Sequence, residues 1–569
     1  MFKLRRFLKH YKKELILGPF FKLLEAIFEL AVPLVMAQII DKGIGNNDSD
    51  YVWKMSGLIV VLGICGLGFA LTCQFFAAKC AYGFGTELRD ALYKHINKFS
   101  HAEIDRFGTS SLITRITNDT VLAQNGVNMF IRLAVRAPFL IVGAAVMSMT
   151  LDLMLSIIFL IAAPIITLII VCVMKKTVPM YKKIQKGLDK ISLLTRENLD
   201  GVRVIRAFSK QEEEKKELIN ESGRLSDNAV IAGKISAILN PVTFMIMNLG
   251  IVAILWFGGI RVDTGYLTQG EITAFVNYMT QILLALVVLA NLVIIFTKAA
   301  SSASRINEVF DTQPSMTDGS DTKFDFSSPA VEFENVSFSY PDAGDLSLNN
   351  ISFTLKKGEI LGIIGGTGSG KSTLANLVPR FYDITSGNIK IFGKDIKKYS
   401  MEELRNLIGI VPQRAALFSG TIADNMRWGK PDATDQEIIS ALKIAQAWEF
   451  VSKLTDGIKT NISQGGKNLS GGQRQRLTIA RALVGNPPVV ILDDSMSALD
   501  YATDLALRKA IESELKDTAV IMISQRATTL QNANHILVLD NGEAAGYGIH
   551  ETLLKNCEEY AEIYKSQMS

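Results

Sequence analysis

The sequence predicts an all-α domain of six transmembrane helices, followed by an α/β domain with a phosphate-binding loop. At 569 residues, the chain is too long to fold around one hydrophobic core. Hydrophobic residues make up 48% of the chain, and their excess lies in the first 300 residues. After residue 330, short apolar runs alternate with helix-compatible segments. We therefore expect a transmembrane domain over residues 1–310, a linker over 311–329 and an α/β domain over 330–569.

Six segments are long and apolar enough to cross a bilayer, which takes about 20 mostly apolar residues as a helix. They cover roughly residues 15–40, 55–78, 131–150, 153–174, 239–259 and 272–297. The first is the weakest by hydropathy, because Lys22, Glu25 and Glu29 interrupt it.

The connections between these segments alternate between short and long. The two long ones, about residues 79–130 and 175–238, are rich in Lys and Arg, and so is the N-terminal stretch Met1–Lys13. The first short loop is acidic instead. By the positive-inside rule, both termini and both long loops are expected in the cytoplasm, in a multi-pass protein of the cell membrane. Since the long loops have helical composition, the membrane helices are expected to continue tens of ångströms beyond the bilayer.

Composition excludes other classes of protein. The 60 basic and 56 acidic residues give a net charge of only +4, which offers no support for nucleic-acid binding. The five cysteines are scattered at spacings that fit neither a metal site nor a disulfide framework. The apolar run after the basic N-terminus is too long for a secretion signal, so we expect the N-terminus to remain in the cytoplasm.

The second half reads as a nucleotide-binding domain. A stretch rich in Asp, Ser, Thr and Pro, Asp311–Pro329, marks the linker. Strand-like apolar runs follow at residues 331–340, 359–366, 407–413, 489–494, 519–525 and 535–540.

One glycine-rich loop stands directly after the second of these runs and before a helix. Its residues match the pattern G-x-x-x-x-G-K-[ST]: Gly365, Gly366, Thr367, Gly368, Ser369, Gly370, Lys371 and Ser372, with Thr373 next. The glycines let backbone N–H groups wrap phosphates at a helix N-terminus. Lys371 is expected to reach the β- and γ-phosphates of ATP, and the Ser372 hydroxyl to ligate Mg²⁺. Asp493, which ends the buried run Val489–Asp493, suits a carboxylate near that Mg²⁺.

With these motifs, the whole chain resembles ABC transporters of the exporter class. In that resemblance, Tyr340 stacks on adenine, and Gln413 contacts Mg²⁺ and senses the membrane domain. The run Leu469, Ser470, Gly471, Gly472 and Gln473 is similar to the signature that caps the γ-phosphate of ATP on the opposite subunit, and Asp500 to an aspartate that crosses the dimer interface. The resemblance also implies a second half-transporter, because two such domains sandwich two ATP molecules head to tail. The segment Glu197–Val202 resembles a short coupling helix that docks on the partner.

Two residues depart from the family pattern. Position 494, normally glutamate, is Asp494, which is one methylene shorter and falls short by roughly 1–1.5 Å. A misplacement of about 1 Å can lower a rate on the order of 100-fold. The usual switch histidine is Gln525, which donates a hydrogen bond but cannot carry a proton near neutral pH. The pair resembles the degenerate half of bacterial heterodimeric multidrug exporters, whose partner carries Glu and His at these positions. A slow homodimer using Asp494 in both sites is the alternative.

The membrane half offers fewer signals. Glu25 and Glu29 share one helical face, and Pro33 frees the carbonyl of residue 29 from its helical hydrogen bond. Ionisable groups in a span suggest contact with a cationic substrate or a proton-linked switch, but pairing with Lys22 or another helix explains them as well. Asn277 and Gln281 are expected either to line a translocation cavity or to form interhelical hydrogen bonds. Arg136 is expected to reach the lipid headgroups.

These features favour an ATP-driven efflux subunit for a small amphipathic substrate in the lipid bilayer, with ATP and Mg²⁺ as cofactors. Two alternatives stay open. A lipid or peptide exporter uses the same scaffold, and a basic lateral groove would favour lipid. A regulatory ATP-binding membrane subunit without transport of its own is the other.

Overall fold

The computed structural model describes residues 2–341 and 343–568. The chain divides into two compact units, and each is described by itself. The N-terminal unit comprises residues 1–97 and 110–312, and the C-terminal unit comprises residues 98–109 and 313–569. The boundary near 312 lies close to the predicted 310. Residues 98–109 differ from the prediction, because they fold with the C-terminal unit.

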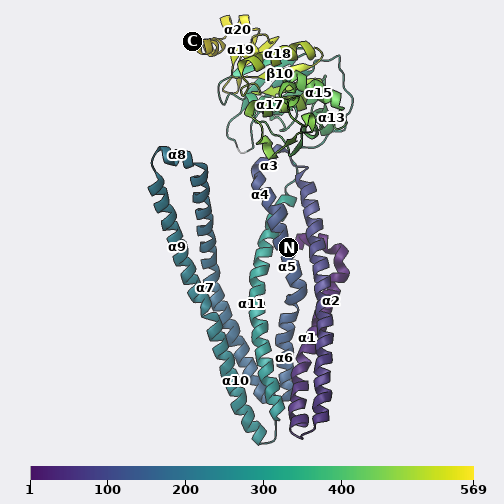
Figure 1. Ribbon diagram of the computed structural model, residues 1–569, viewed down its shortest axis with the longest axis vertical. Helices are drawn as coiled ribbons and strands as arrows, with labels where there is room; N and C mark the ends of the chain where they lie inside the picture. Colours follow the sequence, from purple (N-terminus) through teal and green to yellow (C-terminus); the bar gives the residue numbers. More distant parts are fainter. Residues whose placement is uncertain (1, 342, 569) are drawn as a thin grey trace. The chain divides into compact units, whose positions relative to one another are not determined.

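The N-terminal unit is entirely helical (Figure 1). Its elements are η1 (Phe2–Tyr11), α1 (Lys12–Gln38), η2 (Ile39–Ile44), α2 (Ser49–Ile96), α4 (Thr109–Thr114), η3 (Arg115–Asp119), α5 (Thr120–Met129), η4 (Phe130–Ala134), α6 (Arg136–Leu151), α7 (Leu153–Asp200), α8 (Val202–Ala207), α9 (Gln211–Ala237), α10 (Leu239–Asp263) and α11 (Gln269–Asp311).

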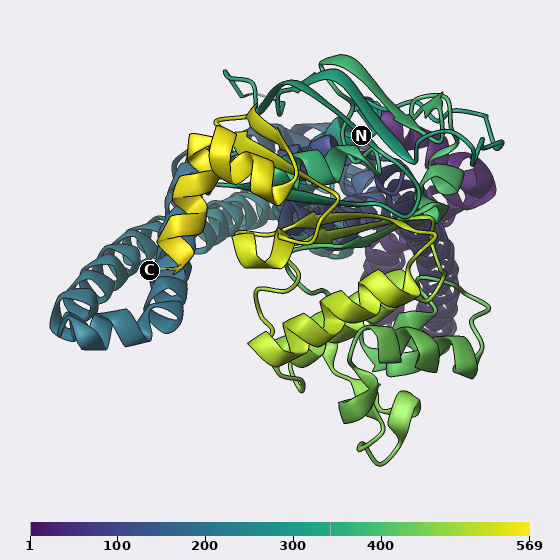
Figure 2. The same cartoon turned by 90° about the horizontal axis from the view of Figure 1, so that it is seen from above.

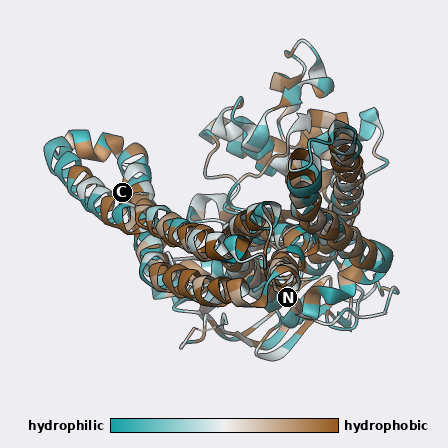
Figure 3. Cartoon of the chain, turned by 90° about the horizontal axis from the view of Figure 1, so that it is seen from below, coloured by the Kyte–Doolittle hydropathy of each residue, from teal (hydrophilic) through white to brown (hydrophobic). Residues whose placement is uncertain are grey.

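Among the described residues, six helical stretches are long and apolar enough to cross a membrane. They are Lys3–Ile44, Ser49–Ile96, Thr109–Leu151, Leu153–Asp200, Gln211–Asp263 and Gln269–Asp311, and each contains one predicted span. Figure 3 shows apolar residues, in brown, concentrated along these long helices. Helix α7 has 48 residues and is therefore about 72 Å long at 1.5 Å per residue. The six-helix all-α prediction, with helices that extend beyond a bilayer, is confirmed.

Carboxylates define where several of these helices begin. Asp48 accepts a hydrogen bond from the Tyr51 N–H at 3.0 Å at the start of α2, and Asp152 accepts one from Leu155 at 2.8 Å at the start of α7. Asp41 accepts from the Thr268 hydroxyl (2.6 Å) and the Gly270 N–H (2.8 Å). This joins the end of the first span to the start of α11.

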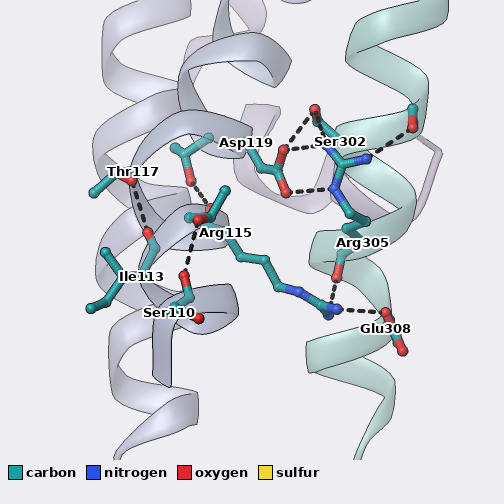
Figure 4. Close-up of polar contacts among 11 residues, drawn as sticks. Ser110, Ile113, Arg115, Thr117, Asp119, Ser302, Arg305 and Glu308 are labelled. Atoms are coloured by element: carbon teal, nitrogen blue, oxygen red, sulfur yellow. Dashed lines mark hydrogen bonds and ion pairs between the residues drawn. The ribbon is translucent and has the colours of Figure 1, made fainter. Parts of the chain in front are cut away.

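A polar network around the buried Asp119 joins η3 to α11 (Figure 4). Asp119 accepts from the Ser302 hydroxyl at 3.0 Å and from Arg305 Nε at 2.8 Å, and it pairs with the second Arg305 nitrogen as well. Arg115 extends the network, since it donates to the Arg305 carbonyl (2.8 Å) and pairs with Glu308 (2.9 Å). Because Asp119 is completely buried, the pairing with Arg305 offsets the free-energy cost of burying a carboxylate here.

The second long loop differs in detail from its prediction. Residues 197–200 complete α7, and Gly201 separates them from the short helix α8. Figure 1 shows α8 connecting the ends of α7 and α9, which run side by side. The short helix of this loop therefore begins at Val202, where the predicted segment Glu197–Val202 ends. Leu199, Val204 and Phe208 are exposed around it.

The C-terminal unit is an α/β fold (Figure 2). Its strands are β1 (Val331–Phe338), β2 (Leu348–Leu355), β3 (Ile360–Gly365), β4 (Ser386–Ile391), β5 (Lys394–Asp395), β6 (Ile408–Val411), β7 (Gly420–Thr421), β8 (Asn461–Ile462), β9 (Val489–Asp493), β10 (Ala519–Ile523), β11 (His535–Asp540) and β12 (Glu543–Gly548). Its helices are α3 (His101–Phe107), α12 (Lys371–Leu377), α13 (Met401–Asn406), α14 (Ile422–Met426), α15 (Asp435–Ile444), α16 (Trp448–Val451), η5 (Gly457–Lys459), η6 (Gln464–Gly466), α17 (Gly471–Leu483), α18 (Tyr501–Glu514), α19 (Ala527–Leu530), α20 (His550–Asn556) and α21 (Glu558–Met568).

The central sheet has the order β12-β11-β3-β10-β9-β6, with only β12 antiparallel to its neighbour. A second, antiparallel sheet has the order β2-β1-β4-β5. Alternate residues of the parallel strands face two cores. Val489 and Ile491 of β9 pack into the core that includes the antiparallel sheet, and Val490 and Leu492 pack into the helical core. Burial on both faces explains why these strands read as continuous apolar runs.

Helix α3 packs against the segment that follows α12. The His101 ring stacks on Phe381 with a centroid distance of 4.4 Å, and the Tyr382 hydroxyl donates to Asp105 at 2.6 Å. Glu103 accepts from the Ser315 N–H at 3.2 Å, which fixes α3 to the start of the linker. These contacts explain why residues 98–109 belong to the C-terminal unit.

Candidate nucleotide-binding site

The phosphate-binding loop connects β3 to α12 and presents the N-terminus of that helix. Gly370 stands just before the helix with φ 97°, a backbone conformation that favours glycine. A Cβ at Gly370 would lie 2.7 Å from the Leu348 side chain and 2.8 Å from the Ser347 carbonyl, so the turn leaves no room for one. A Cβ at Gly368 (φ 84°) would meet no atom, because that glycine faces open space. The loop is thus closely packed on one side and open on the other.

Lys371 lies within this loop. Its ammonium donates to the carbonyls of Gly365 (3.0 Å) and Gly366 (2.5 Å) and to the Ser369 hydroxyl (3.3 Å). Burial lowers the pKa of Lys371, while Asp494 and Asp493 act in the opposite direction. All three acceptors are neutral, and a phosphate oxygen is a stronger partner for an ammonium than a neutral oxygen.

Ser372, in the first turn of α12, contacts Asp493, the last residue of β9. The Ser372 hydroxyl donates to Asp493 Oδ1 at 3.1 Å. Burial raises the pKa of Asp493, and the Ser372 hydrogen bond opposes that rise. A hydroxyl and a carboxylate at this separation supply the hard oxygen ligands that Mg²⁺ prefers, and a divalent cation would favour the ionised form of Asp493. Together with Gln413 on the same cavity, these residues fit a Mg²⁺ site.

Asp494 has an unusual backbone conformation, with φ 44° in the left-handed region. Aspartate and asparagine adopt this region more readily than longer side chains do. The conformation is held by hydrogen bonds from the Asp494 N–H to the Ile523 carbonyl (3.0 Å) and from the Ser497 hydroxyl to the Asp494 carbonyl (2.8 Å). The amide of Gln413 donates to the Asp494 carboxylate at 3.4 Å.

These groups surround one cavity of about 670 Å³. Eleven of the residues predicted from the sequence line it, and they come from β9, α12 and the loops that follow β1, β3, β6, β9 and β10. They are Tyr340, Thr367, Gly368, Gly370, Lys371, Ser372, Thr373, Gln413, Asp493, Asp494 and Gln525. The parallel strands β3, β6, β9 and β10 deliver all of them except Tyr340, which follows β1, because the carboxyl ends of these strands lie at one edge of the central sheet.

Tyr340 forms an aromatic wall of this cavity. Its hydroxyl lies 3.1 Å from the Thr373 hydroxyl, and its ring packs edge-on against Phe338 (4.9 Å) and Tyr382 (5.2 Å). Tyr382 in turn holds Asp105 of α3. Through Tyr382, the aromatic wall is therefore linked to α3.

The signature residues do not line this cavity. Ser470 caps α17: its hydroxyl accepts from the Gln473 N–H at 3.2 Å, while the Gln473 side chain accepts from the Ser470 N–H at 2.9 Å. Ser470 and Gly471 are exposed, and Leu469, Gly472 and Gln473 are partly exposed. Asp500 caps α18 through Thr503, and this backbone hydrogen bond lowers the pKa of Asp500.

Sequence reasoning missed several residues of the cavity wall. Ser347, which precedes β2, and the turn Asn541–Gly542 between β11 and β12 both contribute to the lining. The Asn-Gly pair is a hairpin signal that could have located the turn, but it could not show that the turn lies beside the nucleotide cavity.

The polar residues singled out in the membrane helices have partners within the N-terminal unit. Lys22 pairs with Glu25 at 2.6 Å, and Arg136 pairs with Glu29 at 2.6 Å. For Arg136, the expectation of a headgroup contact was wrong, because an ion pair between two helices satisfies its charge more directly.

The two amides lie on α11. Asn277 donates to the Thr273 carbonyl of its own helix at 3.0 Å. Gln281 points its amide at the Glu29 carbonyl at 3.5 Å, which is the group that Pro33 leaves without a helical donor. The geometry at Gln281 thus corresponds to the interhelical alternative.

Comparison with known proteins agrees with this architecture. The family described as ABC transporter transmembrane region matches residues 15–287, and the family described as ABC transporter matches residues 348–497. An uncharacterized ABC transporter ATP-binding protein of Mycobacterium tuberculosis (strain CDC 1551 / Oshkosh) is 37% identical over 99% of this chain and 97% of its own length. An ATP-dependent lipid A-core flippase of Haemophilus influenzae (strain 86-028NP) is 32% identical over 99% of this chain and 96% of its own length.

A solved structure of a bacterial Atm1-family ABC exporter with ATP bound has the same fold. Its TM-score is 0.81 at 24% identity, over 98% of both chains. The chain therefore belongs to the ABC transporter family, as a multi-pass membrane protein whose one transmembrane region and one ATP-binding domain form an ATP-driven half-transporter with the exporter fold.

Proposed function

We propose that this chain is one subunit of a heterodimeric exporter, in which its own nucleotide site hydrolyses ATP slowly. The observation that carries the proposal is a separation within the C-terminal unit. Asp494 and Gln525 line the chain's own cavity, whereas Ser470 and Gly471 are exposed outside it. The exposed signature residues are accessible to an ATP molecule bound by a partner subunit. Asp494 and Gln525, in contrast, would face the ATP molecule bound in this chain's own cavity.

The backbone at Asp494 supports the slow site. The left-handed conformation is adopted more readily by aspartate than by glutamate, which favours the short carboxylate at this position. Its reach is still roughly 1–1.5 Å less than that of glutamate, because one methylene is missing. Gln525 adds no positive charge at the γ-phosphate. A water molecule beside the phosphate would thus be activated weakly.

The remaining residues bind rather than react. Lys371 and the loop amides hold the phosphates, Tyr340 stacks on adenine, and Asp500 lies at the subunit interface. Among the described residues, no group of three or more His, Cys, Asp or Glu side chains could hold a metal ion. Mg²⁺ would be held by Ser372, Asp493 and Gln413, which lie on one cavity, together with nucleotide oxygens, and when bound it neutralises phosphate charge.

The transport step follows from closure of the two ATP-binding domains over ATP. The membrane helices then turn the substrate path outward, and hydrolysis at the partner's site resets it. We place both termini in the cytoplasm and the chain in the cell membrane, on the distribution of Lys and Arg. The substrate we propose is a small amphipathic drug, and Glu25 and Glu29 are the candidate contacts for a cationic group.

A homodimeric lipid exporter is the second candidate. Two observations favour it: a relative that is named a lipid A-core flippase is 32% identical along nearly the whole chain, and a basic pocket opens beside the N-terminal helix.

The test compares two serines that cap helices in the same way. Ser470 caps α17 and Ser400 caps α13, so replacing either by alanine removes a cap worth about 1 kcal/mol. We expect Ser470→Ala to lower ATPase activity of the assembled transporter by about 10–100-fold, since a hydrogen bond to a charged phosphate is lost. Ser400→Ala should leave the activity within about twofold.

A third variant, Asp494→Asn, distinguishes heterodimer from homodimer. Asparagine accepts the left-handed backbone, so the change removes only the charge. We expect less than about a twofold loss of activity, because the competent site lies on the partner. Equal losses from Asp494→Asn and Ser470→Ala would show a homodimer instead. Brisk, sustained ATP turnover by the purified chain alone would contradict the proposal.

A further inference from the structure

A pocket of about 1140 Å³ opens in the N-terminal unit beside η1. Helix η1 leads directly into α1, whose apolar run begins near Leu15. The pocket therefore lies where the first span enters the bilayer, at the level of the lipid headgroups.

The rim of the pocket is strongly basic. Five cations line it, and its lining includes no acidic residue: Lys3, Arg5, Arg6, Lys9 and Lys12. Lys3 pairs with Asp311 at 2.7 Å, and Arg6 stacks over the Phe310 ring at 4.6 Å. The other three are exposed, and within the residues that the structure describes they form no ion pair. Three cations are thus available to an anionic ligand.

The floor of the pocket is apolar and comes from the membrane helices. Phe84 of α2 and Val127 of α5 are buried, whereas Phe130 of η4 is 49% exposed. The Phe130 and Phe296 rings lie 6.4 Å apart. An apolar surface that continues from a basic rim matches a molecule with an anionic head and a hydrocarbon tail.

We propose that this pocket binds an anionic phospholipid of the cytoplasmic leaflet. The headgroup phosphate faces Arg5, Lys9 and Lys12, and an acyl chain covers Phe130 and Phe296. The rim repels a cationic drug, so the site is distinct from any path for such a substrate. The assignment of the site to the cytoplasmic leaflet rests on the proposed orientation of the termini. Lipid binding itself does not depend on which subunit hydrolyses ATP.

The test measures lipid binding to the full-length chain, with its partner where the two copurify, by native mass spectrometry without nucleotide. The probes are phosphatidylglycerol and phosphatidylcholine, which differ in net charge. We expect the wild type to prefer phosphatidylglycerol. The triple change Arg5→Gln, Lys9→Gln and Lys12→Gln should reduce that affinity about 100-fold, since each cation near an anionic lipid surface contributes about fivefold. The affinity for phosphatidylcholine, whose choline offsets the charge of its phosphate, should fall much less.

The matched control removes three exposed lysines of α7 away from the pocket, Lys182→Gln, Lys183→Gln and Lys186→Gln. Equal losses in both triple variants would overturn the site, because the attraction would then be diffuse. A further variant, Phe130→Gln, should weaken both lipids, and an unchanged affinity would overturn the acyl-chain contact. Inorganic phosphate that binds as tightly as the lipid would do the same.

Hydrogen exchange on the wild type gives a second measurement that needs no variant. Phosphatidylglycerol, but not phosphatidylcholine, should slow exchange in residues 3–12, and added salt should remove the difference. Equal exchange with both lipids would contradict the proposal. So would protection that appears on dimer formation without lipid, which would mean that a second copy covers the pocket.

Discussion

Charged residues act differently in the two halves of this molecule. In the C-terminal unit, Lys371, Asp493 and Asp494 converge on one open cavity. In the N-terminal unit, Glu25 and Glu29 each have a cation within 2.6 Å, and Asp119 is buried against Arg305. Charge in the first case surrounds a cavity for a ligand. Charge in the second case is paired inside the fold, within one helix for Glu25 and between two helices for Glu29 and Asp119. A charged residue in a membrane helix therefore signals function only after its partners within the fold are known.

The largest test of this comparison is the Asp119–Arg305 pair. Replacing Arg305 with methionine leaves the Asp119 carboxylate buried without its cation, which typically lowers the free energy of unfolding by about 3–5 kcal/mol. The control is Lys94→Met, which breaks the exposed pair with Asp90 and should cost less than about 1 kcal/mol. Thermal unfolding in detergent measures both. Similar losses in the two variants would mean that the network in Figure 4 does not stabilise the fold.

In the C-terminal unit, removal of a cation should lower the affinity for ATP rather than the stability of the fold. Lys371→Ala removes the ammonium that serves the phosphates, and we expect ATP affinity to fall about 10–100-fold, as for a hydrogen bond to a charged group. The melting temperature without ATP should change little, because the three oxygens that Lys371 contacts are neutral. Equilibrium binding of a fluorescent ATP analogue gives the affinity. A large loss of stability at unchanged affinity would reverse the comparison.

The sequence predicted the structural elements better than the contacts between distant residues, for a physical reason. Length and hydropathy located all six spans, and strand-like runs located β1, β3, β6, β9, β10 and β11. Strands β2, β4 and β12 were missed, because polar residues interrupt the apolar pattern of β2 and β4, and β12 consists mostly of Ala and Gly. The predicted residues of the nucleotide site lie together in the structure, because the strands end at one edge of the central sheet. The partner of Glu29 could not be found, because Arg136 is 107 residues away and nothing local selects it.

A smaller effect tests whether Glu29 is structural. Its pair with Arg136 is partly exposed, so its coupling energy should be about 1 kcal/mol. We expect Glu29→Gln and Arg136→Gln each to lower the melting temperature, and the double variant to lose less than the sum of the two. Additive losses in this cycle, together with loss of transport in Glu29→Gln alone, would return Glu29 to the substrate path.

The smallest expected effect is a pH dependence of α3. Burial lowers the pKa of His101 below its ordinary 6.5, Arg405 adds to this, and Asp105 opposes it. Below pH 6.5 the undocked histidine binds a proton that the docked one resists, so the docking of α3 is fully stable above pH 6.5 and weakens as the pH falls. Hydrogen exchange of residues 101–107 at pH 7.5 and 5.5 measures this. His101→Phe keeps the ring stack on Phe381 and should abolish the difference, while a wild type that is more protected at pH 5.5 would refute it.

Residues 98–109 give the molecule an interleaved covalent plan. The chain passes between the units at 97/98, 109/110 and 312/313, so three peptide connections join them where a simple tandem protein has one. A fragment that begins at residue 313 would lack α3 and leave Phe381 and Tyr382 uncovered. An α3 peptide supplied separately or grafted onto the new N-terminus should cover these two residues again.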